Sequence, residues 1–126
     1  MADEDRRKHR RFTLGKWGRV VLSPIGTEAP GQLIDMSSHG ASITTRWAVT
    51  AGVGVFVSFR AGGQACEATG SVVRVFPFGE LYGLAVELGY ANPEFLGFLR
   101  ALEAAPEASR PDMLDTIEEL VVSLGA

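Results

Sequence analysis

Short segments in which apolar and polar residues alternate fill residues 16–88, and a period of two is typical of β-strands. The clearest runs from Val53 to Phe59, with an apolar residue at every second position. Turn-forming Gly, Pro and Ser residues separate the segments. We therefore predict six strands, at residues 16–22, 32–36, 41–45, 53–59, 66–76 and 82–88.

Helical signals begin only after the last of these strands. Asn92 can cap a helix in which Pro93 occupies the first turn, and we predict that this helix continues to Ala104 with an apolar face against the strands. Ser109 and Asp112 resemble a capping box, so the chain from 105 to 126 is predicted to form a second, amphipathic helix. Its apolar stripe consists of Met113, Leu114, Ile117, Leu120, Val121 and Leu124. This stripe either docks on the domain or serves as a homodimer or partner surface.

Six short strands with mostly local connections favour an all-β fold, a closed or nearly closed antiparallel barrel with C-terminal helices. We expect a basic arm at 1–11, the barrel and first helix at 12–104, and the amphipathic helix at 105–126.

The composition is that of one globular domain, with 46% hydrophobic and 21% charged residues in 126. A single cysteine, Cys66, excludes an intrachain disulfide and a cysteine metal cluster. No apolar run approaches the ~20 residues that a membrane span requires. Since the start of the sequence also lacks a secretory signal, we expect a cytoplasmic protein.

Charge is distributed unevenly along the chain. The formal net charge of -3 argues against general nucleic-acid binding. However, seven of the 12 Lys and Arg residues lie between Arg6 and Arg19, a segment without Asp or Glu, whereas 93–126 is acidic. Such a cationic arm either attracts an anionic ligand or only improves solubility.

Catalytic constellations are missing from the sequence. The two histidines, His9 and His39, fall in the basic arm and in a short turn, and the barrel carboxylates show no recognisable spacing. Nucleotide-binding glycine motifs are also absent. We expect a protein that is not an enzyme and that holds no metal and no cofactor.

Two local motifs carry chemistry. The first places Arg7 and Arg11 at the ends of an RxxxR pattern, where planar guanidinium groups suit phosphate oxygens and base faces. The second runs from Asp35 through Ser37 to Gly40 at the second turn. Alone, this segment also fits a local turn in which Asp35 and Ser37 bond their own backbone and Gly40 takes a positive φ.

Together, RxxxR and DxSxxG in this order resemble the PilZ domain, a bacterial receptor module for the second messenger cyclic di-GMP. The resemblance covers most of the chain and implies the six-stranded PilZ barrel. It also implies that Arg7 and Arg11 clamp the ligand from a mobile arm that becomes ordered on binding, with Arg6 in support. Asp35 would accept hydrogen bonds from a guanine edge, Ser37 would bond the ligand, and Gly40 would allow close backbone approach.

On the basis of this resemblance, we expect a monomer or weak homodimer that binds cyclic di-GMP and signals to an unidentified protein partner in trans. We expect no nucleic acid to be bound. Two alternatives stay open. The chain could be a PilZ-like adaptor with vestigial ligand binding, or a β-barrel that binds single-stranded nucleic acid.

Overall fold

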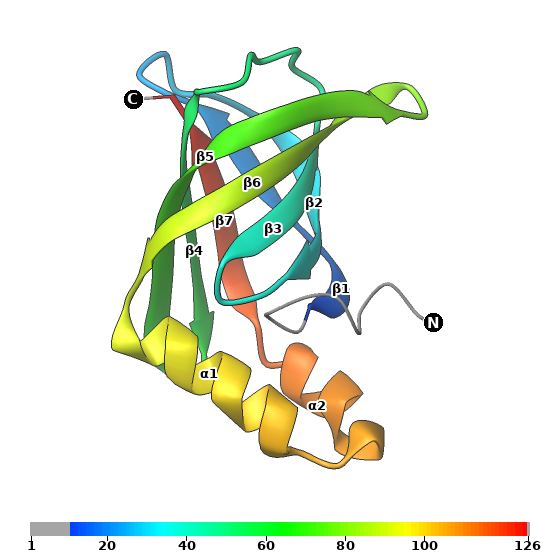
Figure 1. Cartoon of the computed structure of the whole chain (residues 1–126), viewed down its shortest axis with the longest axis vertical. Helices are drawn as coiled ribbons and strands as arrows, with labels where there is room; N and C mark the ends of the chain where they lie inside the picture. Colours follow the sequence, from blue (N-terminus) through cyan, green and yellow to red (C-terminus); the bar gives the residue numbers. More distant parts are fainter. Residues whose placement is uncertain (1–10, 126) are drawn as a thin grey trace.

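The computed structural model describes residues 11–125, which form a closed barrel of seven strands with short helices at one end (Figure 1). The strands are β1 (Phe12–Leu22), β2 (Thr27–Met36), β3 (Gly40–Thr45), β4 (Gly54–Ala61), β5 (Gln64–Phe78), β6 (Leu81–Ala91) and β7 (Glu118–Leu124). They follow the order β1-β2-β3-β6-β5-β4-β7 around the barrel. All neighbours are antiparallel except β1 and β7, which pair in parallel and close the barrel. The all-β barrel fold is thus confirmed, and each of the six predicted strands is present.

The barrel interior is filled by the apolar residue of each alternating pair. Val55, Val57 and Phe59 of β4 point inward and are buried, whereas Phe56 between them is exposed. The same alternation on the other strands produces one continuous core. Burial of these side chains is the main favourable contribution to the stability of the fold.

Helix α1 (Pro93–Ala104) covers one end of this core, as predicted (Figure 1). The Oδ1 atom of Asn92 accepts a hydrogen bond from the Phe95 amide at 2.8 Å, the expected N-cap, and one from the Glu67 amide of β5 at 3.1 Å. Buried side chains of α1 pack into the open end, where the Phe95 ring lies 5.8 Å from that of Phe59. The cap therefore fixes both the start of α1 and its position against β5.

The predicted second helix is wrong. The segment instead forms a 3₁₀ turn at Glu107–Ser109, a short helix α2 (Arg110–Leu114) and strand β7, and Ser109 makes no side-chain cap bond. Leu120, Val122 and Leu124 are buried at every second position, although Leu120 and Leu124 also fit a helical stripe. Pairing decides between the two, because β7 fills the gap between β4 and β1 and leaves neither strand with an open edge.

Candidate functional site

Residues of the RxxxR and DxSxxG patterns meet at the end of the barrel where β1 begins. Arg11 directly precedes β1, and Asp35 lies near the end of the neighbouring β2, opposite Thr13. The Arg11 Nη1 atom donates a hydrogen bond to Asp35 Oδ1 at 2.9 Å. The two side chains are 32% and 25% exposed, so a ligand in solution can reach both.

A β-bulge aims Asp35 at the outer face of the barrel. Leu33 pairs with Ile43 and Asp35 with Ser42, which leaves Ile34 as an extra residue on β2. Leu33 and Met36 both point into the core. Under strict alternation Asp35 would share the inward face with Leu33, and the bulge therefore places this carboxylate outside.

The turn after β2 is held by Ser37. Its buried Oγ atom accepts hydrogen bonds from the backbone amides of His39 at 3.2 Å and Gly40 at 3.1 Å, while the Ser37 amide donates to the Gly40 carbonyl at 2.8 Å. The local turn interpretation is thus confirmed for Ser37. It is wrong for Asp35, whose carboxylate bonds Arg11 instead of its own backbone.

Gly40 leaves room for Arg11, and its φ is not positive, so that part of the turn prediction is wrong. A Cβ atom at this position would lie 2.9 Å from Arg11 Nη2 and 3.2 Å from the Val86 carbonyl oxygen. The missing side chain therefore lets the Arg11 guanidinium lie against the β3 backbone. The structure thus brings Arg11, Asp35, Ser37 and Gly40 together, whereas Arg6 and Arg7 lie outside the described residues.

The C-terminal segment supports this site in a way that no sequence motif indicates. Arg110 donates from Nε to the Leu102 carbonyl at 2.9 Å, and its Cζ lies 5.8 Å from the centre of the Phe12 ring. Arg110 thereby joins the end of α1 to the residue that follows Arg11. A cavity of about 350 Å³ lies between Arg11 and this C-terminal segment.

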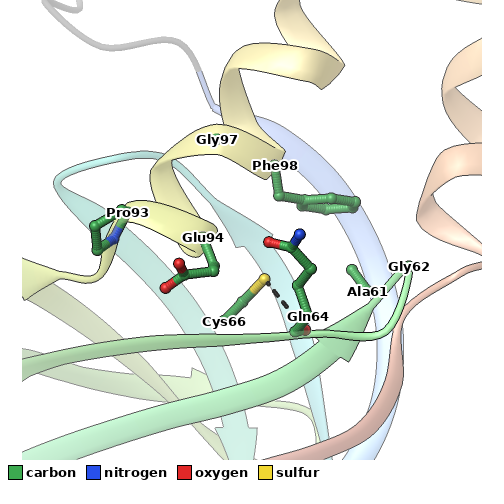
Figure 2. Close-up of a pocket in the computed structure, with 8 residues that line it drawn as sticks. All are labelled: Ala61, Gly62, Gln64, Cys66, Pro93, Glu94, Gly97 and Phe98. Atoms are coloured by element: carbon green, nitrogen blue, oxygen red, sulfur yellow. Dashed lines mark hydrogen bonds between the residues drawn. The ribbon is translucent and has the colours of Figure 1, made fainter.

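A second cavity, of about 340 Å³, lies between the β4–β5 hairpin and α1 (Figure 2). Its lining residues are Ala61, Gly62, Gln64, Cys66, Pro93, Glu94, Gly97 and Phe98. Burial raises the pKa of the Cys66 thiol, and the negative charge of Glu94 raises it further. The raised pKa keeps this thiol protonated at neutral pH, which makes it a weak nucleophile.

The Cys66 thiol is accordingly expected to react with iodoacetamide much more slowly than free cysteine at neutral pH. A raised pKa leaves a smaller thiolate fraction at every pH below it, and the rate should increase as the pH approaches that pKa. Mass spectrometry of the native protein over a pH series measures this, with urea-unfolded protein as the reference. Equal rates for native and unfolded protein at neutral pH would contradict the burial argument.

Residues 11–125 contain no group of three or more His, Cys, Asp or Glu side chains placed to bind a metal ion. None of the helices within the same range has the length and apolar character needed to cross a membrane.

The model of the PilZ domain family matches residues 5–96, which include both motifs, β1 to β6 and the start of α1. A search of curated proteins found no match. The matched part covers well over half of the chain and contains the Arg11–Asp35 pair and the turn ending at Gly40. The chain therefore belongs to the PilZ domain family.

Proposed function

We propose that this protein binds cyclic di-GMP on the outer face of the barrel beside Arg11, Asp35 and Gly40. PilZ domains are a family of cyclic di-GMP-binding domains and not a family of enzymes. The observation that carries the proposal is the Arg11–Asp35 pair, which lies partly exposed over a glycine that leaves room for it.

The chemistry of the pair matches that of the ligand. Cyclic di-GMP has two phosphates, which suit the planar donor fork of Arg11, and two guanines, whose N1–H and N2–H₂ groups suit the Asp35 carboxylate. The hydrogen bond between them orients both groups before binding. A ligand that offers a phosphate to Arg11 and a guanine edge to Asp35 replaces one charge-assisted bond with several.

Further contacts are proposed from the residues before Arg11. Arg7 and Arg6 would reach phosphates or guanine faces from the basic arm, which would become fixed over the ligand. Ser37 would contribute chiefly by holding the turn, because its Oγ atom already accepts two backbone bonds. The surface made by the arm and the ligand would then be recognised by a protein partner in trans, without catalysis by this chain.

Titration of the wild-type protein with cyclic di-GMP by calorimetry tests the proposal. We expect saturable binding with a Kd in the micromolar range or below, and competition by excess GMP should be weak because GMP offers a single guanine. A single-stranded oligonucleotide serves as the second competitor. No heat at ligand concentrations well above micromolar, or displacement by the oligonucleotide alone, would contradict the proposal.

A further inference from the structure

A second β-bulge, on β5, turns an arginine to the outer face of the barrel. Val72 pairs with Val86 and Arg74 with the adjacent Ala85, so Val73 is the extra residue. Val72 and Val86 are buried in the core, whereas Arg74 is exposed. Strict alternation would aim Arg74 into the core together with Val72, and the bulge reverses this orientation.

This bulge and the one at Ile34 place two opposite charges in one row across the sheet. Asp35 pairs with Ser42, Ser42 with Ala85, and Ala85 with Arg74. Between the two bulges, β3 and β6 pair without interruption, and they lie side by side with β5 across the barrel wall (Figure 1). Three strand spacings separate Asp35 from Arg74, which is about 14 Å. We call these four residues the Asp35–Arg74 row.

The middle of the Asp35–Arg74 row projects little from the outer face of the sheet, because Ser42 and Ala85 have small side chains that are partly exposed. At the adjacent end of β3, the Arg11 guanidinium lies over Gly40. The row therefore leaves room for a ligand that reaches from the Asp35 carboxylate at one end to Arg74 at the other.

The Arg74 side chain is held for stacking rather than for an ion pair. Its Cζ lies 4.9 Å from the centre of the Phe76 ring, and this ring covers Gly83 of β6 so closely that a Cβ there would collide with it. Within residues 11–125, Arg74 forms no ion pair with a carboxylate. One face of the guanidinium is thus backed by an aromatic ring, and the group stays available to a planar partner.

We propose that Arg74 is a further ligand-contacting residue, whose guanidinium stacks on one guanine of cyclic di-GMP at the end of the Asp35–Arg74 row opposite Asp35. This inference rests on the proposed function. It adds a base-reading position on β5 that neither RxxxR nor DxSxxG contains. Phe76 lies against the guanidinium, and the base would stack on the opposite side of that group.

Titration of the full chain with cyclic di-GMP compares wild type with Arg74→Ala, Arg74→Lys and the control Arg60→Ala. Arg60 is also an exposed barrel arginine, but it lies on β4 and donates to the Gly63 carbonyl. We expect Arg74→Ala to weaken binding by about tenfold or more, the usual effect of losing a stack on a base. Arg74→Lys should remain nearly as weak because lysine lacks the planar group, and Arg60→Ala should bind as wild type.

The outcomes separate this inference from the proposed function. If wild type binds and Arg74→Ala binds equally well, Arg74 makes no contact and the inference fails while the proposed function stands. If Arg74→Lys restores full affinity, the contact is a charge only, and the stacking role is overturned. If wild type does not bind, both fail. Thermal unfolding of each variant, expected to match wild type because Arg74 is exposed, excludes loss of fold as the cause.

Discussion

Deletion of residues 118–126 is expected to unfold the barrel rather than to remove a dispensable appendage. These residues contain β7, which pairs with both β4 and β1 and buries Leu120, Val122 and Leu124. Burial of one such side chain contributes about 1.5–3 kcal/mol, so three approach the whole stability of a small domain, about 5–15 kcal/mol. Circular dichroism and size-exclusion chromatography should show loss of the β signal or aggregation through the exposed edges of β1 and β4.

Two point variants test the same strand in the full chain. Leu124 is fully buried, and Leu124→Ala should lower the free energy of unfolding by about 2–5 kcal/mol in a denaturant titration. Ser123, its partly exposed neighbour on the outer face, is the matched control, and Ser123→Ala should be close to neutral. A truncated chain that keeps a cooperative unfolding transition and a wild-type spectrum would show that β7 does not complete the barrel.

The first six strands and α1 could be predicted because local sequence and tertiary structure agree there. Alternation in β4 coincides with the hairpin pairing of β4 and β5, and Asn92 both caps α1 and bonds the β5 backbone. The RxxxR and DxSxxG patterns likewise predicted that Arg11 and Asp35 belong to one site. In the structure, Nη1 of Arg11 lies 2.9 Å from Oδ1 of Asp35.

Strand β7 could not be predicted because its partners are far away in the sequence. Leu120 and Leu124 fit a helix as well as a strand, and only the gap between β4 and β1 decides between them. The family model ends at residue 96, so the motif resemblance also gave no information about this segment.

The orientations of Asp35 and Arg74 were hidden for a related reason. A bulge is a mismatch between two strands, and it becomes visible only when both partners are known. From the sequence, nothing in the neighbourhood of Arg74 distinguishes it from Arg60, another arginine of the barrel. Pairing across four strands is what aligns Arg74 with Asp35.

Asp35→Ala is expected to weaken cyclic di-GMP binding by about 100-fold or more, because two charge-assisted hydrogen bonds to a guanine edge are lost. The sign of this effect is informative. Asp35 is negative, and so are the phosphates of the ligand. If the site attracted the ligand only through its arginines, removal of the carboxylate would free Arg11 and tighten binding. Calorimetric titration of wild type and variant therefore distinguishes base recognition from simple charge attraction.

Glu28→Ala provides the matched control, because Glu28, like Asp35, pairs with an arginine. Its Oε2 atom lies 3.2 Å from Nη1 of Arg19 in β1. It should leave the Kd within about twofold of wild type, since Arg19 and Glu28 are not part of the proposed site. Asp35→Ala itself should change the free energy of unfolding by no more than about 1 kcal/mol, because its ion pair is partly exposed. A loss of affinity without a loss of stability would show that Asp35 contacts the ligand. Equal or tighter binding would show that Asp35 makes no such contact and that basic residues alone attract the ligand.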